Sequence, residues 1–242
     1  MKFPGPLVEG RLVRRYQRFL ADVVLADGSV VTVHCANPGS MLGVSRPGSR
    51  VRISRAGNPA RKLPWTLETI RVGRTWVGVH PVRANPVVEE ALRRGRIEPL
   101  ADYPTVDREV PLAGRRVDFR LRGPGRPPLW IEVKYATWAV GDLALFPDSV
   151  SERALHHLAL LESRVRAGDA AALLLVTGRA DVARIGPADG IDPRYGRALR
   201  TARRRGVQIL AYRMRVRRTE LTLGSRLRLD PGPHPATAPS TA

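Results

Sequence analysis

Residues 115–135, RRVDFRLRGPGRPPLWIEVKY, decide the fold expected for the second half of the chain. Two runs of strand composition, 115–122 and 129–135, are separated by a turn rich in glycine and proline. Because side chains alternate between the faces of a strand, Glu132 and Lys134 share one face. Asp118 lies within reach of Glu132 if the two runs pair as a hairpin. The sequence therefore predicts three charged groups at one place on a sheet, beside apolar neighbours.

These three groups predict a metal-dependent hydrolytic centre. Carboxylates beside apolar residues cost stability unless a cation neutralises them, and Mg²⁺ or Mn²⁺ binds through one or two carboxylates plus a phosphate oxygen. Such a cation polarises a phosphodiester and supplies hydroxide, while an ammonium orients water or stabilises developing charge. We predict Asp118 and Glu132 as catalytic metal ligands and Lys134 as the catalytic ammonium, with Glu109 as a candidate third metal ligand. The alternative is an ion pair between Glu132 and Lys134 on a solvated strand face.

The elements around this stretch predict an α/β domain with a mixed sheet. A helix begins at Pro86 and ends at Gly95, and Ser149 with Glu152 forms a capping-box pattern for a second helix. The expected order is helix 86–95, strands 105–110, 115–122 and 129–135, helix 149–167, strand 170–177, helix 193–205, strand 207–213 and edge strand 220–229. Asp-x13-Glu-x-Lys across a hairpin, in the order α-β-β-β-α-β, is the signature of PD-(D/E)XK nucleases.

The first third of the chain predicts a small β-barrel. Runs 19–25 and 29–35 are joined by Ala-Asp-Gly, a tight hairpin signal, and further short strands are expected at 51–54, 66–72 and 75–80. An OB-like barrel is the common nucleic-acid-binding form at this size, and an SH3-like barrel has a similar pattern. We predict an OB-like barrel at 1–83, a PD-(D/E)XK-like domain at 84–229 and a disordered tail at 230–242.

The 242-residue chain carries 41 basic and 22 acidic side chains, a formal charge of +19. This excess favours a polyanionic partner, with nucleic acid first; the alternative is a genome-wide excess of arginine. Only Lys2, Lys62 and Lys134 are lysines, which marks a retained lysine as a position that needs a compact ammonium. The single cysteine, Cys35, excludes an intrachain disulfide and a cysteine-rich zinc site.

No segment predicts a membrane location. The longest apolar run is the seven residues 170–176, whereas a helix needs about 20 to span a bilayer. The first ten residues, MKFPGPLVEG, lack the apolar core of an export signal. We therefore expect a cytoplasmic protein.

Several residues of the first third are candidates to contact nucleic acid. Residues 15–19 interleave basic and aromatic groups, as on surfaces that stack single strands, and Arg61 and Lys62 are expected to contact phosphate. For the first segment, the alternative is that Phe19 belongs to the barrel core and its arginine neighbours are solvated. For the loop that follows the run 29–35, a structural turn fits as well as phosphate binding. The predicted nucleic-acid-binding residues are Arg15, Tyr16, Arg18, Asn37, Ser40, Arg61 and Lys62.

The second expected helix carries two adjacent histidines, His156 and His157. One of two adjacent helix positions can turn toward the sheet and face the predicted site, and a buried, hydrogen-bonded histidine is the alternative role. Asp148 precedes this helix and is interpreted first as a helix-start residue and second as a ligand.

Together these motifs resemble the sugar fermentation stimulation proteins of bacteria and archaea. The resemblance covers nearly the whole chain, and it implies an OB-like N-terminal domain, a PD-(D/E)XK-like C-terminal domain, non-specific DNA binding and a role in regulating sugar metabolism, notably of maltose. The family's Asn-Thr-Gly-Ser-Met is here Asn-Pro-Gly-Ser-Met, and the lysine expected before its helix histidine is here His156. The matching blocks are RYQRFLADV (15–23), HCANPGSM (34–41), NPARKLPWTLE (58–68), RRVDF (115–119), WIEVKYAT (130–137), FPD (146–148) and IDPRYGRAL (191–199).

Two hypotheses of function follow. The first is a Mg²⁺- or Mn²⁺-dependent nuclease that binds DNA with little sequence preference, because phosphate contacts carry no sequence information. The second is a non-catalytic DNA-binding regulator of sugar metabolism whose nuclease-like fold is only a scaffold. DNA is the expected partner, and RNA as a further substrate and a homodimer are left open.

Overall fold

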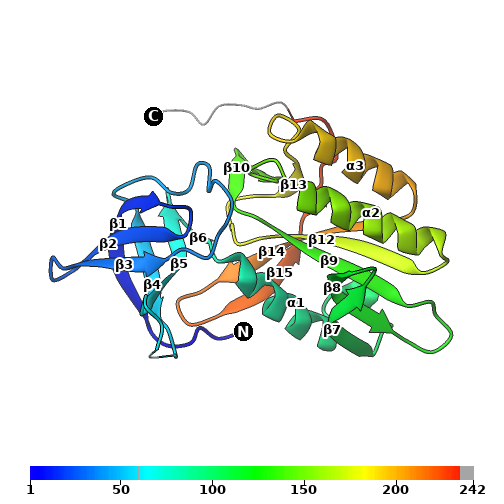
Figure 1. Ribbon diagram of the computed structural model, residues 1–242, viewed down its shortest axis with the longest axis horizontal. Helices are drawn as coiled ribbons and strands as arrows, with labels where there is room; N and C mark the ends of the chain where they lie inside the picture. Colours follow the sequence, from blue (N-terminus) through cyan, green and yellow to red (C-terminus); the bar gives the residue numbers. More distant parts are fainter. Residues whose placement is uncertain (59, 235–242) are drawn as a thin grey trace.

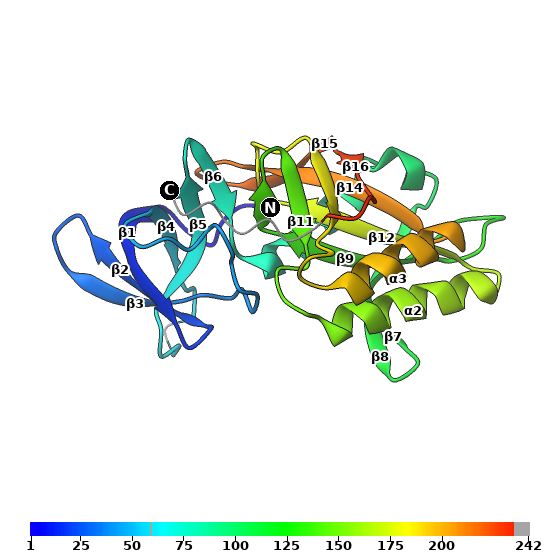
Figure 2. The same cartoon turned by 90° about the horizontal axis from the view of Figure 1, so that it is seen from above.

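Six strands of the N-terminal part form one sheet, of which five close into a barrel, seen on the left of Figures 1 and 2. The computed structural model of the chain describes residues 1–58 and 60–234. The strand order is β3-β2-β1-β4-β5-β6, and a pairing of His34 with Thr66 joins β3 to β5 and closes the barrel. The strands are β1 (Leu7–Tyr16), β2 (Leu20–Leu25), β3 (Val30–His34), β4 (Arg50–Arg55), β5 (Trp65–Val72) and β6 (Thr75–Gly78).

The first strand, β1, was not predicted. Of its ten residues, Leu7 and Leu12 are the buried ones, and the pairing of β1 with β2 shifts register between Leu12 and Arg14. A bulge of this kind breaks the alternation of apolar and polar residues from which a strand is recognised. The alternative that Phe19 belongs to the barrel core does not hold, because 43% of its surface is exposed.

The C-terminal part is built on a mixed sheet with the order β15-β14-β12-β9-β8-β7. Strand β12 runs parallel to both β9 and β14, and the other neighbours are antiparallel. Strands 115–122 and 170–177 have the predicted bounds. The elements are the 3-10 turns Pro81–Arg83 and Glu98–Leu100, α1 (Ala84–Arg93), β7 (Thr105–Leu112), β8 (Arg115–Arg122), β9 (Leu129–Ala136), α2 (Glu152–Arg166), β12 (Ala170–Thr177), α3 (Pro193–Arg204), β14 (Gln208–Val216) and β15 (Leu221–Arg226).

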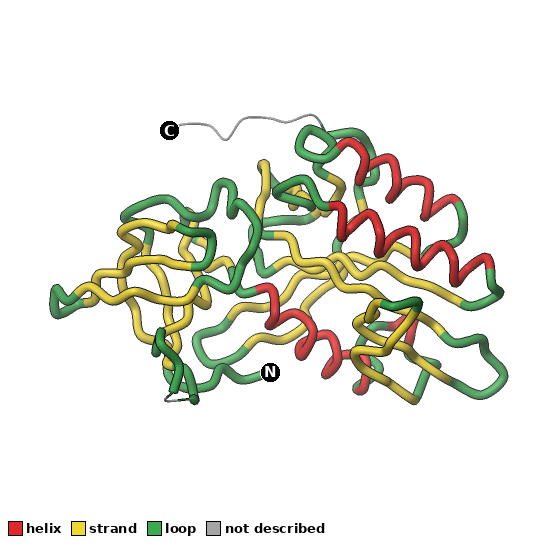
Figure 3. Tube along the Cα trace, in the orientation of Figure 1, coloured by secondary structure: helices red, strands yellow, loops and turns green. Residues whose placement is uncertain are grey.

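Helices cover both faces of this sheet, as Figure 3 shows. Leu174 of β12 packs into the core that contains α1, whereas its neighbours Leu173 and Leu175 pack into the core that contains α2 and α3. The continuous apolar run therefore has the predicted cause, since both faces of β12 are buried. No helix among the described residues is long and apolar enough to cross a membrane.

A second, four-stranded sheet was not predicted. Its strands are too short for a clear periodicity, and the segment expected as one edge strand, 220–229, is divided between β15 of the main sheet and β16 of this one. The order is β10-β11-β13-β16, with β10 (Trp138–Val140), β11 (Leu143–Phe146), β13 (Arg184–Pro187) and β16 (Arg228–Leu229).

Two expected boundaries, the start of α2 and the start of the C-terminal tail, differ in the structure. Helix α2 is capped by Ser151, whose side chain accepts from the Ala154 N–H, and not by Ser149. The start of the expected disordered tail is docked on the domain, because Asp230 pairs with Arg184 at 2.6 Å and the His234 carbonyl accepts from the Gly190 N–H. The rest of that predicted tail, 235–242, lies outside the described residues.

Candidate functional site

The predicted charged groups meet where strands β8 and β9 separate. Their ladder ends at the pair Phe119–Ile131, and beyond it Asp118 Oδ2 accepts from the Val133 N–H at 2.7 Å. A carboxylate thus takes the place of a backbone carbonyl at the point where the ladder ends. Ile131 packs into the core on the α1 side, and Glu132 points to the opposite side, where it meets α2.

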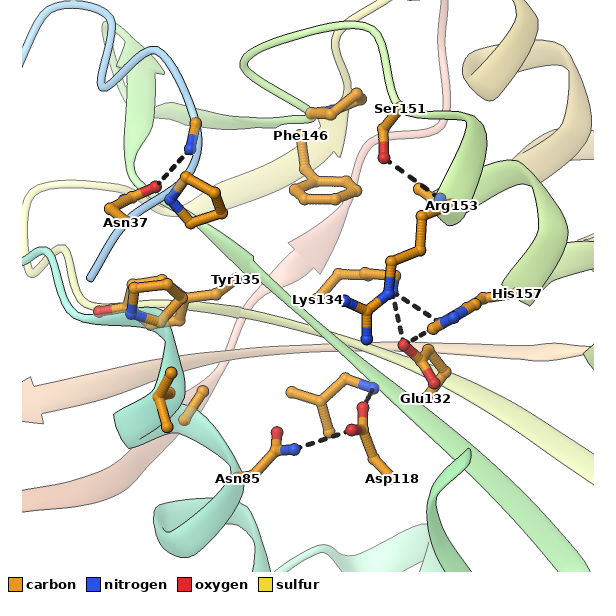
Figure 4. A pocket seen from close by; sticks show the side chains of 18 of the residues that line it. Asn37, Asn85, Asp118, Glu132, Lys134, Tyr135, Phe146, Ser151, Arg153 and His157 are labelled. Atoms are coloured by element: carbon orange, nitrogen blue, oxygen red, sulfur yellow. Dashed lines mark hydrogen bonds and ion pairs between the residues drawn. The ribbon is translucent and has the colours of Figure 1, made fainter. Parts of the chain in front are cut away.

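Glu132, Lys134 and His157 form one buried cluster (Figure 4). Lys134 Nζ donates to Glu132 Oε1 at 2.5 Å and lies 3.0 Å from His157 Nδ1, which also bonds Glu132 Oε1. Glu132 is 4% exposed and His157 is 5% exposed. The cluster is therefore not an ion pair on a solvated strand face. It is a desolvated group of charges of the kind that marks functional sites more often than surfaces.

The two carboxylates have opposite pKa shifts. Burial and the neighbouring charge of Glu132 raise the pKa of Asp118 to about 6, against the smaller effects of the Val133 N–H, Lys134 and Asn85. Burial alone would raise the pKa of Glu132 as well, but the hydrogen bond from His157 and the charge of Lys134 outweigh it and lower that pKa. Asp118 therefore carries the electrostatic cost of two acidic groups at one place.

The charged cluster lies in a cavity of about 810 Å³ between the barrel and the α/β part. Both parts of the chain line this cavity: Asn37 comes from the barrel, Asn85 from the start of α1, and Arg153 and His157 from α2 (Figure 4). Several of the lining side chains are cationic, which favours an anionic ligand. These are Arg18, Arg108, Arg115, Arg116, Lys134 and Arg153.

Asp148 joins the two walls of the cavity. Its side chain accepts from the Met41 N–H at 2.9 Å, and its carbonyl accepts from Ser40 Oγ at 2.7 Å. The barrel loop approaches Asp148 closely at Gly39, where a Cβ would lie 2.2 Å from Asp148 Oδ1. Asp148 therefore links the barrel loop to the segment before α2, a role that neither the helix-start nor the ligand interpretation includes.

Comparison with known proteins matches both parts of the chain. The SfsA N-terminal OB domain matches residues 13–79, and the sugar fermentation stimulation protein RE domain matches residues 82–220. The chain belongs to the sugar fermentation stimulation protein family.

Relatives in this family match nearly the whole chain. A sugar fermentation stimulation protein homolog from Syntrophotalea carbinolica is 50% identical over 228 residues, 94% of this chain and 98% of the relative. A homolog from Acidithiobacillus ferrooxidans is 48% identical over 220 residues, 90% of this chain and 95% of the relative. The structure of Pyrococcus furiosus SfsA in complex with Ca²⁺ is 20% identical, with a TM-score of 0.86 over 95% of this chain and 98% of that one. The predicted fold, an OB-like barrel followed by a nuclease-like α/β domain with a mixed sheet, is confirmed.

The residues predicted to bind nucleic acid divide into different roles in this family member. The Arg15 guanidinium donates to the carbonyls of Arg18, Asn37, Gly39 and Ser40, so it holds the loop together. Arg18 itself reaches the cavity, as does Asn37, whose Oδ1 accepts from the Gly39 N–H. Of the barrel candidates, the structure therefore brings Arg18 and Asn37 to the site.

The other barrel candidates lie outside the cavity lining. The Tyr16 hydroxyl donates to Asp22, and Arg14 covers its ring at 4.6 Å. Ser40 is part of the junction with Asp148. Arg61 and Lys62 are exposed on the loop between β4 and β5, where Arg61 donates to Thr66 Oγ1.

Glu109 does not join Asp118 and Glu132 as a third acidic ligand. It lines the cavity, but its side chain is 46% exposed and lies 3.7 Å from Arg116. A φ of 49° at Glu109 interrupts the regular course of β7 opposite β8. Within residues 1–58 and 60–234, no group of three or more His, Cys, Asp and Glu side chains is placed to hold a metal ion.

Asn85 is a site residue that the sequence analysis missed. Its Nδ2 donates to Asp118 Oδ1 at 2.8 Å, so both oxygens of Asp118 are held. The available signal was its position beside Pro86 at the start of α1, which indicates a helix start and says nothing about a distant partner. His157, one of the two histidines left open, faces the site, and His156 lies 3.4 Å from Arg115.

Proposed function

We propose that the chain is a metal-dependent phosphodiester hydrolase that acts on DNA with little sequence preference. The observation that carries this proposal is the convergence of Asp118, Glu132 and Lys134 in one cavity with arginines around them. Two carboxylates and an ammonium are the groups that such a hydrolysis needs, and the arginines suit the phosphates on either side of the scissile bond. We place this activity in the cytoplasm.

The residues present fit a hard divalent cation. Burial and the charge of Glu132 raise the pKa of Asp118, and a bound cation would offset the repulsion between the two carboxylates. Mg²⁺ binds through one or two carboxylates and keeps waters or phosphate oxygens in its other positions, so a third acidic ligand is not required. The structure of Pyrococcus furiosus SfsA is a complex with Ca²⁺, a cation that prefers oxygen ligands. Asp118 and Glu132 would hold the ion, which when bound supplies Lewis-acid stabilisation of the phosphate and lowers the pKa of a bound water.

The other residues orient these ligands. Asn85 and the Val133 N–H fix Asp118 through both oxygens. His157 and Glu132 hold the Lys134 ammonium, so that this point charge is available to an attacking water or to the charge that develops on phosphorus oxygens. His157 acts through Lys134 and is therefore a positioning residue in this proposal.

DNA binding is supported by the charge of the chain and by the position of the arginines. Arg18 from the barrel and Arg153 from α2 face the same cavity as the carboxylates. Arginine pairs with phosphate through a planar fork and carries no information on base sequence. A single strand of DNA would therefore contact both parts of the chain at once.

The test compares the wild type with Lys134→Ala on end-labelled single-stranded and duplex DNA, with Mg²⁺, with Mn²⁺ and with EDTA. We expect the wild type to cleave with either metal and not with EDTA. Lys134→Ala should lose cleavage and keep its DNA affinity, since the arginines remain. Arg74→Ala, which removes an exposed cation of the barrel outside the cavity lining, is the matched control and should keep cleavage. A wild type that cleaves neither DNA nor RNA with either metal rejects the hydrolase and leaves the non-catalytic regulator.

A further inference from the structure

The end of the cavity nearest the barrel differs in chemistry from the charged end. Asn37, Tyr135 and Phe146 all line this cavity; in Figure 4, Asn37 and Tyr135 lie on the side away from Glu132 and His157, and Phe146 lies between Asn37 and Arg153. The lining includes further apolar groups, among them Val82, which is 65% exposed. An apolar, partly aromatic surface beside a phosphate-binding floor is the combination that proteins use for nucleotides, with the ring faces available to a base.

The ring of Tyr135 is fixed by both parts of the chain. Its hydroxyl donates to the Gly78 carbonyl at 3.0 Å. Gly78 of the barrel and Gly178 after β12 both lie close to this hydroxyl. A Cβ would lie 2.6 Å from it at Gly78 and 2.1 Å from it at Gly178. The hydroxyl is therefore committed to the protein, and what Tyr135 offers to the cavity is its ring.

Phe146 and Asn37 each have a contact that orients the side chain. The Phe146 ring meets the fully buried Tyr195 edge to face, with centroids 5.2 Å apart and an interplanar angle of 74°. Asn37 Oδ1 accepts from the Gly39 N–H, and no described residue accepts from its Nδ2. A rigid aromatic surface costs little conformational entropy on binding, and a free amide N–H at its rim suits an acceptor on a base edge.

We propose that Tyr135, Phe146 and Asn37 form a base subsite, which receives one unstacked nucleobase of the strand whose phosphate lies at Asp118 and Glu132. The position of that phosphate rests on the proposed function, whereas the subsite rests on the three side chains. A base inside a duplex is stacked on both faces and must be extruded before it can enter such a pocket. The substrate is therefore DNA that is single-stranded at this point, or a frayed end, in preference to a continuous duplex.

Binding in EDTA separates this subsite from any hydrolysis. The probes are a short fluorescent DNA strand, a strand of the same length made of abasic sugar-phosphate units, and a blunt duplex. Because bases stack on aromatic side chains, we expect the wild type to bind the base-bearing strand about tenfold more tightly than the abasic one, and more tightly than the duplex. Fluorescence anisotropy gives the three affinities.

Phe146→Leu keeps an apolar side chain and removes the ring. We expect it to lose the preference for the base-bearing strand while its affinity for the abasic strand is unchanged, which also shows that the variant is folded. Tyr135→Leu provides an independent second variant. The matched control is Trp76→Leu on β6, whose ring lies under Arg52 at 3.7 Å outside the cavity lining and should not affect the preference.

The outcomes distinguish the two proposals. A wild type that cleaves with Mg²⁺ but binds base-bearing and abasic strands equally overturns the subsite alone. A wild type that prefers the base-bearing strand in EDTA and never cleaves supports the subsite and overturns the hydrolase. Equal losses of Phe146→Leu on both strands, or a duplex bound as tightly as the single strand, overturn the subsite. A wild type that binds neither strand overturns both proposals.

Discussion

Glu68 on β5 and Glu132 on β9 are strand glutamates at 2% and 4% exposure, yet their carboxylates are satisfied differently. Glu68 accepts from Arg83 through both oxygens and from Ser54 Oγ. Glu132 accepts through Oε1, and no described residue hydrogen-bonds its Oε2. A buried carboxylate with both oxygens satisfied is a structural link, whereas one with a free oxygen beside a second carboxylate has capacity for a ligand.

The same contrast separates the two parts of the molecule. The pair of Glu68 and Arg83 fastens the barrel to the segment that leads into α1, and Pro81 and Val82 of that segment line the cavity. The pair of Glu68 and Arg83 thus supports one side of the cavity, whereas Glu132 and Lys134 are the groups to which the proposed function gives the chemistry. We therefore expect that removing Glu68 lowers the stability of the protein, whereas removing Glu132 lowers its cleavage activity.

The largest expected effect is on cleavage by Glu132→Gln. The amide keeps the shape but removes a charged ligand, so we expect Mg²⁺-dependent cleavage to fall about a thousandfold, equivalent to about 4 kcal/mol of transition-state stabilisation. Single-turnover cleavage of a labelled strand measures it. Glu162→Gln is the control, because Glu162 is a buried glutamate paired with Arg205 outside the cavity lining. A Glu132→Gln variant that keeps a tenth of the wild-type rate refutes the assignment.

Glu68→Gln should act on stability instead. Arg83 would lose its carboxylate partner, and breaking a buried pair costs about 3 kcal/mol where one partner keeps some contact with solvent, as Arg83 does at 24% side-chain exposure. Urea unfolding measures this loss of unfolding free energy. The cleavage rate of the folded variant should equal that of the wild type. Loss of cleavage with unchanged stability would contradict the structural role that we assign to Glu68.

The stability of the protein should also depend on pH through His80, which follows the last barrel strand. Burial lowers the pKa of His80 to about 4, with Arg83 and His34 acting in the same direction and Glu68 against them. The unfolded chain takes up this proton near pH 6.5, so between pH 6.5 and 4 it binds more protons than the folded chain, and the unfolding free energy falls as the pH falls. We expect His80 to account for about 2 kcal/mol of this fall in the unfolding free energy. The effect is limited to this size because the residue is only partly buried.

His80→Gln should flatten this pH dependence, measured by urea unfolding at pH 7, 5.5 and 4. A remainder is expected from His34, whose pKa is also lowered by burial and by Arg61. If the unfolding free energy depends on pH with the same slope in His80→Gln and in the wild type, a group other than His80 causes the pH dependence.

The parts that could be predicted from the sequence are those that depend on local rules. Strand alternation placed Glu132 and Lys134 on one face, and the glycine and proline turn bounded β8 correctly. Strand β1 was missed because a bulge disturbs its pattern, and the exposed position of the Glu109 side chain beside Arg116 could not be foreseen because its positive φ departs from strand geometry. Both departures depend on pairing with other strands, which a single run of residues does not reveal.

The residues that complete the site are set by distant contacts. Asn85 and Asp118 are 33 positions apart, and Ser40 and Asp148 are 108 apart. Tyr135 could be predicted on a strand, but its contacts with Gly78 and Gly178 depend on the end of β6 and the segment after β12, which meet only in the folded chain. Local pattern thus predicts which charges share a face, and the tertiary fold decides which groups surround them.

Asn85 gives the smallest effect and tests whether groups around the ligands matter. Asn85→Ala removes the donor to Asp118 Oδ1 and leaves the Val133 N–H on Oδ2, so the carboxylate keeps one of its two restraints. Loss of a residue that orients a metal ligand costs about tenfold to a hundredfold in metal affinity. We expect the tenfold end for Mn²⁺ measured by titration calorimetry, with Asn58→Ala in the β4–β5 loop as the unaffected control. Equal Mn²⁺ affinities of the two variants would show that Asp118 is oriented by the backbone of β9 alone. The difference between Glu68 and Glu132 would then concern only the carboxylates that bind the metal, and not the residues that surround them.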